Sequence, residues 1–316
     1  MSKYIHELKI GGVTAANNVF LAPLAGVADS AFRTVCREFG AGLVYSEMIS
    51  AKGIHYGSNG SERLAEHRPI EEPFAVQIFG HEPEICAEAA AFFEKKGAKL
   101  IDINMGCPVP KVCGNHEGSF LLTEPETVYN VVAAVAGAVT IPVTVKMRRG
   151  FRNGEEVAPE IAKLCEAAGA AAVTVHGRFR EQYYSGAADR GVVRRVKEAV
   201  RIPVIASGDI IDLKTAEQTF EETGCDGIMI GRGALGRPWI FEEIISGVRL
   251  GVDLKAIIMH HIMLEIEDKG EAVAIRELRK HLAWYFKGMR GAAQLKNEAF
   301  GAENLGGLLK ILDKLQ

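Results

Sequence analysis

The chain has 316 residues, 48% of them hydrophobic and 24% charged, and its formal net charge is −3 at pH 7. That length is enough to bury a large core, and the composition is typical of a globular protein. The small acidic excess excludes a protein that coats nucleic acid with its whole surface, although it is compatible with a local basic face.

The cysteines and the apolar runs indicate where the protein works. Six cysteines form no C-x-x-C pair and no secreted-type framework, which favours a reducing compartment. No apolar run approaches the ~18–20 residues of a membrane span, and residues 1–6 lack a signal-peptide core. We therefore expect a cytoplasmic protein without a membrane partner, and the sequence indicates no bound metal.

Short apolar runs rich in β-formers recur through the first 230 residues. Most of these runs are continuous, which is typical of parallel strands covered on both faces. Strands are expected at residues 19–23, 42–48, 74–79, 100–104, 142–147, 172–176, 203–207 and 227–230. Helical segments with caps or closing glycines lie between them, among them 30–39, 83–97, 123–137 and 212–224. This alternation predicts an α/β fold, a (β/α)8 TIM barrel.

The pattern changes in the last quarter of the chain, where only helical periodicity remains. Helices are expected at residues 254–269, 271–288 and 305–315. We therefore expect two domains, a barrel over residues 1–243 and a small C-terminal helical bundle over residues 244–316. No long linker separates them, so the two parts should pack directly.

The functional residues of a TIM barrel lie at the carboxyl ends of its strands. Cys107 follows such a strand end, three residues after Asn104, where a thiol can act on a bound ligand. Its alternative role is that of a small, buried hydrophobe that covers the strand. Cys113, six residues further on, is expected to belong to the loop structure only.

Glycine turns follow strands seven and eight, at residues 207–209 and 231–233. Glycine lets backbone N–H groups approach a phosphate, so the pair of turns predicts a phosphate-bearing ligand. Gln77 and Lys146 end two other strands and would suit an isoalloxazine ring, whose reduced form is anionic. For Lys146 the alternatives are a Schiff base or a phosphate clamp, and for His176 the alternative is a satisfied core histidine.

Basic side chains gather in three stretches, although the chain as a whole is acidic. They follow strands five and six and recur in the helical region, and together they predict a groove for a phosphate backbone. The spacing of Arg276, Arg279 and Lys280 places these three on one helical face. The full set is Arg148, Arg149, Arg152, Arg178, Arg180, Arg190, Arg194, Arg195, Arg276, Arg279, Lys280, His281, Lys287, Arg290 and Lys296.

Several blocks of this sequence resemble the tRNA-dihydrouridine synthase family, most closely its bacterial B-type branch. The most specific block is Asn104-Met-Gly-Cys-Pro108, which is combined with His176-Gly-Arg178 and Tyr184-Ser-Gly186. The other blocks are residues 19–29, 42–48, 224–233 and the pair 238–239. The resemblance runs from about residue 10 to residue 294, so it includes both expected domains.

The resemblance implies an FMN enzyme that reduces the C5=C6 bond of selected uridines in tRNA with NADPH as the reductant. It implies that Cys107 protonates C5 while the flavin delivers a hydride to C6. It also implies that Asn104, Arg148, Arg178 and Tyr184 contact the substrate, and that Arg276, Arg279 and Lys280 contact the tRNA. The implied FMN positions are Ala22, Pro23, Leu24, Gln77, Lys146, His176, Ser207, Gly208, Asp209, Gly231 and Arg232.

The chain departs from the family pattern at a few positions. Leu24 stands where methionine is usual, Ser207 where asparagine is usual, and the loop after Cys107 carries Gly114 and His116 in place of the usual residues. Two other functions therefore stay open. One is a small-molecule FMN oxidoreductase of the dihydroorotate or ene-reductase kind, and the other is an RNA-binding homologue without turnover.

Overall fold

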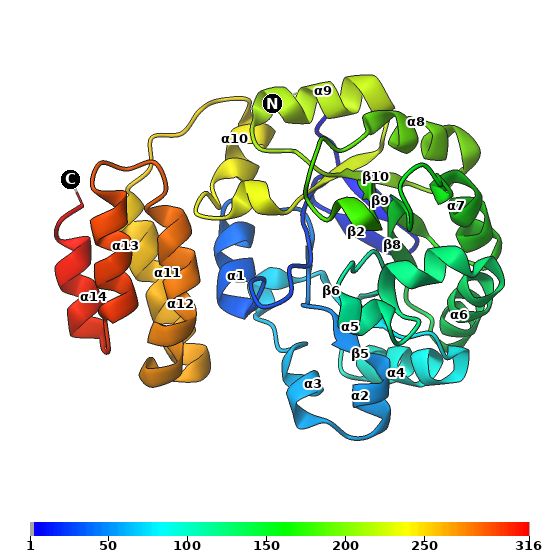
Figure 1. The fold of residues 1–316 in the computed structure, drawn as a ribbon, viewed down its shortest axis with the longest axis horizontal. Coiled ribbons are helices and arrows are strands. Elements are labelled where there is room, and N and C mark those ends of the chain that lie inside the picture. Colours follow the sequence, from blue (N-terminus) through cyan, green and yellow to red (C-terminus); the bar gives the residue numbers. More distant parts are fainter. Residues whose placement is uncertain (1–2, 316) are drawn as a thin grey trace.

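The computed structural model describes residues 3–315 and has two parts, a barrel and a helical bundle (Figure 1). Within these residues, eight parallel strands follow one another around the barrel, and the bridge between Phe20 and Leu43 closes the ring. All eight expected strands are confirmed, and a short β5 (Ile49–Ser50) extends the sheet beside β6. The eight are β3 (Val19–Leu21), β4 (Val44–Tyr45), β6 (Phe74–Phe79), β7 (Leu100–Met105), β8 (Val143–Gly150), β9 (Ala172–Phe179), β10 (Val204–Ser207) and β11 (Gly227–Ile230).

Helices cover the outside of the barrel, and their ends follow the expected capping chemistry. Asp29 Oδ1 accepts a hydrogen bond from the Phe32 N–H at 3.0 Å, and Asp212 Oδ1 accepts one from the Thr215 N–H at 2.8 Å. Gly224 ends its helix in the left-handed conformation. These helices are α1 (Ser30–Glu38), α4 (Pro83–Lys95), α6 (Pro125–Ala138), α7 (Ala158–Ala167), α8 (Arg190–Ala199), α9 (Leu213–Thr223) and α10 (Ile240–Ser246), with the shorter α2 (Ala51–His55), α3 (Asn59–Arg63) and α5 (Pro110–Cys113).

A hairpin that the sequence patterns did not predict closes one end of the barrel. Strands β1 (Leu8–Ile10) and β2 (Val13–Ala15) pair in antiparallel register. Their apolar side chains pack against Leu100, Ala172 and Ile205, which lie at the beginnings of barrel strands. The hairpin therefore covers the amino-terminal end of the barrel and leaves the opposite end for a ligand.

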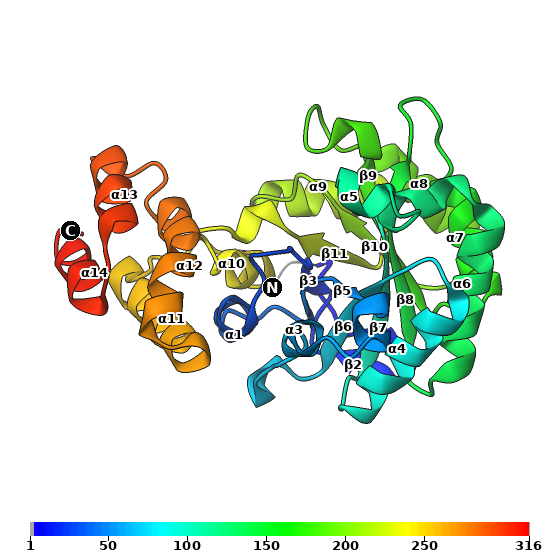
Figure 2. The same ribbon diagram turned by 60° about the horizontal axis from the view of Figure 1, so that its bottom comes forward.

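The C-terminal bundle has a hydrophobic core of its own and contacts the barrel through α1 (Figure 2). Its helices are α11 (Leu254–Lys269), α12 (Glu271–Tyr285), α13 (Ala292–Gly301) and α14 (Leu305–Leu312), of which α13 was not expected. Ile240, Phe241 and Ile244 of α10 belong to the barrel core, so the boundary expected after residue 243 falls inside a barrel helix. We propose that the barrel part extends through α10.

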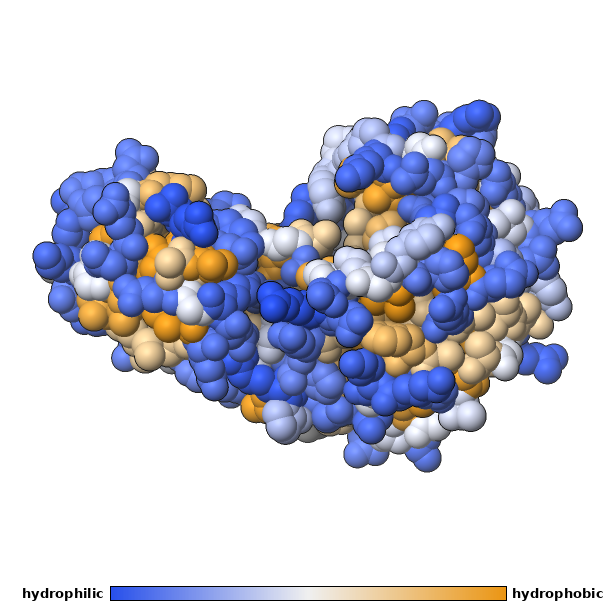
Figure 3. All heavy atoms as spheres, turned by 90° about the horizontal axis from the view of Figure 1, so that it is seen from below, coloured by the Kyte–Doolittle hydropathy of each residue, from blue (hydrophilic) through white to orange (hydrophobic). Residues whose placement is uncertain are grey.

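The two parts form lobes with a broad notch between them (Figure 3). Ala31 and Val35 of α1 pack against Leu264 of α11, so the two lobes contact each other through these helices. Among residues 3–315, no helix combines the length and the apolar character that crossing a membrane requires.

Candidate active site

A cleft of about 720 Å³ opens at the carboxyl ends of the barrel strands. Because parallel strands end at the same edge, residues far apart in the sequence converge there. The cleft is lined by all eleven expected FMN positions and by the expected Asn104, Cys107, Arg148 and Tyr184. The eleven are Ala22, Pro23, Leu24, Gln77, Lys146, His176, Ser207, Gly208, Asp209, Gly231 and Arg232.

The floor of the cleft is a chain of buried hydrogen bonds. Asn104 Nδ2 donates to Gln77 Oε1 at 2.8 Å, and Gln77 Nε2 donates to Asp102 Oδ2 at 2.6 Å. Thr144 Oγ1 donates to the other carboxylate oxygen of Asp102, also at 2.6 Å. Burial raises the pKa of Asp102 to about 6, and the two hydrogen bonds and the Lys146 ammonium oppose that rise. The chain of bonds fixes the orientation of the Gln77 amide at the cleft.

Lys146 places a cation at the same floor. Burial lowers the pKa of its ammonium to about 8, and repulsion from Arg148 adds to this effect while Asp102 and Cys107 oppose it. A desolvated ammonium of this kind attracts a negatively charged ligand more strongly than a solvated one does. Lys146 is therefore placed to bind the anionic edge of a ring.

Backbone contacts hold the turn that carries Cys107. The Cys107 N–H donates to Asn104 Oδ1 at 2.9 Å, and the Gly106 N–H donates to the same oxygen at 3.0 Å. Ser119 Oγ donates to the Cys107 carbonyl at 2.8 Å, and Cys113 Sγ lies 3.4 Å from that carbonyl oxygen. Cys113 is thus part of the loop structure, as expected, and these contacts leave the Cys107 thiol to face the cleft.

The chemical state of Cys107 follows from its surroundings. Burial raises the pKa of its thiol, and a hydrogen bond from the backbone of Val109 only partly opposes this. The thiol therefore stays protonated at neutral pH and can act as an acid. Asn104 was expected to contact substrate, but its carbonyl oxygen is already used to shape the turn.

The opposite side of the cleft is a cradle around Gly208. This glycine has φ +118°, and a Cβ there would lie 2.7 Å from Ala188 Cβ and 2.9 Å from His176 Cδ2. The next residue, Asp209, has φ +52°, and Ala188 N–H donates to its Oδ2 at 2.8 Å. Such a turn brings backbone N–H groups close to a bound anion, as the sequence predicted.

Arg178 does not line the cleft, although it was expected to contact the substrate. Its buried guanidinium donates to both carboxylate oxygens of Asp209, at 2.9 and 2.8 Å. It also donates to the carbonyls of Ser185 and Gly186, at 3.1 and 2.6 Å. The residue therefore fixes the loop that carries Tyr184 against the turn after β10.

Arg148 braces the other side of the same loop. Its Nε donates to the Gly106 carbonyl at 2.8 Å, and its Nη1 donates to the carbonyls of Phe179 and Tyr183, at 2.9 and 3.0 Å. Burial lowers its pKa to about 10, at which value the guanidinium is still charged at neutral pH. Arg148 therefore ties the Cys107 turn to the end of β9.

The basic stretches are less uniform than the sequence suggested. Arg149 and Arg195 both pair with Glu156, at 2.7 and 2.6 Å, so the arginines near β9 are partly neutralised. In the bundle, His281 is fully buried and was wrongly counted among the basic surface residues. Arg279 is half-buried and donates to the Ala302 carbonyl at 3.1 Å.

The remaining basic residues of the bundle differ in position. Arg276 is exposed and Lys280 is half-buried, so these two residues and Arg279 do not form one evenly exposed stripe. Lys287, just after α12, lines the cleft itself. Its basic character was noted in the sequence, but its place at the cleft depends on how the bundle docks on the barrel.

The unusual loop after Cys107 lies outside the cleft. Neither Gly114 nor His116 is among the lining residues. The His116 ring packs against Phe120 with ring centres 4.4 Å apart, and its Nδ1 lies 3.4 Å from a Glu124 carboxylate oxygen. This departure from the family pattern therefore lies outside the residues that line the cleft.

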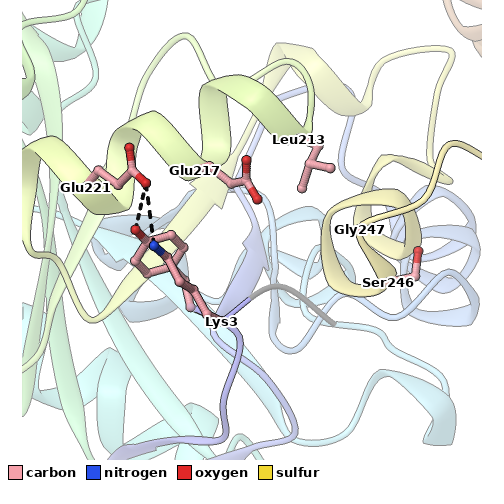
Figure 4. A pocket seen from close by; sticks show the side chains of 7 residues that line it. Lys3, Leu213, Glu217, Glu221, Ser246 and Gly247 are labelled. Atoms are coloured by element: carbon pink, nitrogen blue, oxygen red, sulfur yellow. Dashed lines mark hydrogen bonds and ion pairs between the residues drawn. The ribbon is translucent and has the colours of Figure 1, made fainter.

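A second hollow lies beside α9 and α10, away from these residues (Figure 4). It is open, and part of its polar lining is already paired: Tyr4 OH donates to a Glu221 carboxylate oxygen at 2.9 Å, and Lys3 lies 3.8 Å from the same oxygen. We assign no ligand to it.

Several solved structures of barrel proteins are similar in shape and have little sequence identity to this chain. Histamine dehydrogenase from Rhizobium sp. 4-9 matches with a TM-score of 0.59 at 14% identity, over 83% of this chain and 51% of that one. A variant of NCR from Zymomonas mobilis matches with a TM-score of 0.56 at 16% identity, over 80% and 94% of the two chains. These matches bear on the fold alone and confirm the barrel.

Sequence comparisons are much closer. A probable tRNA-dihydrouridine synthase of Rickettsia conorii is 40% identical over 307 residues, which cover 94% of this chain and 92% of the relative. The tRNA-dihydrouridine synthase B of Xanthomonas axonopodis pv. citri is 41% identical over 288 residues, which cover 89% and 87%. Residues 20–315 match the dihydrouridine synthase (Dus) family profile. The chain therefore belongs to the dihydrouridine synthase family.

Proposed function

We propose that this chain reduces the C5=C6 bond of uridines in tRNA to give dihydrouridine, with FMN in the cleft and NADPH as the reductant. Membership of the dihydrouridine synthase family and about 41% identity to a tRNA-dihydrouridine synthase B support the reaction class. The observation that carries the proposal is one cleft that holds both a protonated thiol and a desolvated ammonium, those of Cys107 and Lys146.

The residues around the cleft fit a flavin mononucleotide. A volume of about 720 Å³ suits a cofactor together with part of a substrate. The turn at Gly208 has no room for a Cβ beside Ala188 and His176, and a glycine turn of this kind can present backbone N–H groups to a bound phosphate. Arg232 lies beside this turn, and Lys146 and Gln77 would meet the polar edge of the ring. Bound FMN in its reduced form would supply a hydride to C6 of uracil.

Cys107 would supply the proton that completes the reduction. The S–H bond breaks, its electron pair stays on sulfur, and the proton forms the new C–H bond at C5. The resulting thiolate takes a proton back from solvent before the next turnover. Asn104 and Ser119 hold the turn in place, so the thiol does not need to reorganise for this step.

The proposed partner is tRNA, whose target uridine has to enter the cleft. The target base must leave its stack to enter a cleft at the end of a barrel. Tyr184 lies at the cleft, and the guanidinium of Arg232 is 4.5 Å from its ring centre, so this pair forms part of the wall. Lys287 and the exposed Arg276 lie on the bundle side, where they can contact phosphates.

The test is a reconstituted reaction with FMN-loaded protein, unmodified tRNA transcripts, and either NADPH or NADH. Dihydrouridine in the digested RNA is measured by mass spectrometry, and Cys107→Ala provides the matched inactive control. We expect dihydrouridine at defined positions and faster turnover with NADPH. Reduction of cyclic enones without reduction of tRNA would instead identify a small-molecule reductase, and RNA binding without any reduction would identify an inactive homologue.

A further inference from the structure

We propose that a divalent transition-metal ion, for which zinc is the test case, binds at the junction of the barrel and the bundle. Its ligands are Asp29, His261, Glu265 and His281. Each offers one ligand atom, and these atoms all lie within 4.8 Å of one another. None of the four residues lines the cleft, so this site is separate from the proposed active site. The sequence alone indicated no metal.

The fold brings these ligands together from three separate places in the chain. Asp29 caps α1 of the barrel, His261 and Glu265 lie one turn apart on α11, and His281 lies on α12. Residues four apart share a helix face, so the two ligands of α11 point the same way. Figures 1 and 2 both show α1 beside the bundle helices at this junction.

The hydrogen-bonding capacity of the cluster is unfulfilled. His281 is fully buried, and neither of its ring nitrogens has a partner. His261 Nε2 and Glu265 Oε1 are also buried without a partner, whereas Glu265 Oε2 lies 2.8 Å from the Lys269 ammonium. Buried polar groups are normally satisfied, so this concentration of free lone pairs at one point needs an explanation. A metal ion would accept one lone pair from each of the four residues.

The surrounding contacts resemble the outer shell of a metal site. His261 Nδ1 lies 3.1 Å from the Tyr285 hydroxyl, which orients the other ring nitrogen toward the cluster. The Lys269 ammonium lies 2.8 Å from Asp29 Oδ2 and 2.8 Å from Glu265 Oε2. Each carboxylate therefore has an outer partner, as ligating carboxylates in metal sites usually do.

The net charge around the cluster also favours a divalent cation. Asp29, Glu265 and Glu277 all lie within 2.8 Å of Lys269, so three carboxylates surround one ammonium. This group carries a formal charge of −2 when every carboxylate is ionised. A divalent cation would bring the formal charge of this ionised group to zero.

The donor set decides the class of metal. Two imidazole nitrogens and two carboxylate oxygens suit zinc and, less selectively, manganese or iron(II). Bonds of about 2.1 Å in a tetrahedral site place ligand atoms about 3.4 Å apart. The present spread of up to 4.8 Å closes to this value through side-chain movements of about 1 Å. Four protein ligands leave no open position, so the ion would be structural and would fix the bundle on the barrel.

The first experiment is metal analysis of the untagged, full-length, FMN-loaded chain by mass spectrometry, before and after dialysis against EDTA. Stripped protein is then titrated with Zn²⁺, Mn²⁺ and anaerobic Fe²⁺ against a chromogenic chelator. We expect one metal ion per chain and a rise in the thermal midpoint of about 5 °C or more on rebinding. FMN content, read from its absorbance, reports that the fold is intact.

Variants locate the ion. Glu265→Gln and His281→Phe should weaken binding about 100-fold or more, whereas His260→Ala should not change it. His260 is a matched control because it is the neighbouring histidine on α11 and pairs with Glu38 at 2.9 Å outside the cluster. Absence of metal together with no uptake and no thermal shift would overturn the proposal. Uptake that survives both cluster variants would overturn it as well, since the ion would then lie elsewhere.

Discussion

Replacing Cys107 with alanine should block the last proton transfer and leave the flavin pocket intact. The contacts that hold its turn use the backbone N–H and carbonyl of Cys107, which alanine retains. The side chain contributes only a thiol that faces the cleft. We therefore expect normal FMN content and normal reduction of the flavin by NADPH in Cys107→Ala.

The size of the effect follows from the role of a general acid. Loss of a positioned acid lowers the rate by roughly 10²–10⁴-fold, which corresponds to about 3–5 kcal/mol in activation free energy. Burial raises the pKa of the Cys107 thiol, so the acid form persists through neutral pH. Titration of Cys107 should therefore not limit the rate of the parent enzyme near neutral pH, whereas loss of the Lys146 ammonium, whose pKa is about 8, should lower the rate as the pH rises through 8.

Stopped-flow absorbance separates the two half-reactions. In Cys107→Ala, oxidation of the pre-reduced flavin by tRNA should slow, while the reductive half-reaction should match that of the parent. Cys113→Ala is the control, because its sulfur contacts the same carbonyl but faces the loop. The assignment fails if dihydrouridine formation is undiminished, or if both half-reactions slow equally. A rate that climbs steadily between pH 7 and pH 9 would show that a thiolate acts instead.

Three further predictions concern the cofactor, stability and RNA. Gly208→Ala should lose most of its FMN, because the added Cβ would lie 2.7 Å from Ala188 Cβ. Gly154→Ala controls for backbone strain, because Gly154 has φ +86° but open space around it. Equal flavin absorbance at about 450 nm in the two variants would refute the predicted loss of FMN. Asp102 has a pKa of about 6 in the folded chain, against an unfolded value of about 3.9, so its ionised form costs up to about 3 kcal/mol above pH 6 and nothing below pH 4. Asp102→Asn should therefore exceed the parent in urea stability at pH 8 and match it near pH 4; a pH-independent difference would contradict the assignment. Lys287→Ala should weaken tRNA binding and reduce the slope of log affinity against log salt concentration by about one unit. Lys310→Ala on α14 should change neither quantity. Identical slopes for the two variants in filter binding would exclude a phosphate contact at Lys287.

Local sequence patterns were enough to predict the barrel. Parallel strands covered on both faces read as continuous apolar runs, and capping residues and glycines mark where the helices between them begin and end. The carboxyl ends of parallel strands meet at one edge, so the residues there could be assigned to one site before any contact was known. Cys107, Lys146 and Gly208 were predicted in this way, and all three line the cleft.

Short or weakly periodic elements escaped this reasoning. Each strand of the β1–β2 hairpin has only three residues, too few to establish a period, and α13 lies in a region with few apolar anchors. The boundary expected after residue 243 falls inside α10, a helix that local sequence patterns assign to neither part. Its packing against the barrel, which no local pattern encodes, decides where it belongs.

The roles of individual charged residues were decided only by the tertiary structure. A sequence shows that Arg178 is basic and follows a strand, but a guanidinium acts on whatever its five N–H groups reach, and here they reach Asp209 and two carbonyls of the same loop. Likewise, Asp29 and His281 stand more than 250 residues apart, and only the docking of α1 on the bundle brings them together. Composition and periodicity act over a few neighbouring residues, whereas a site made across two lobes depends on how those lobes pack.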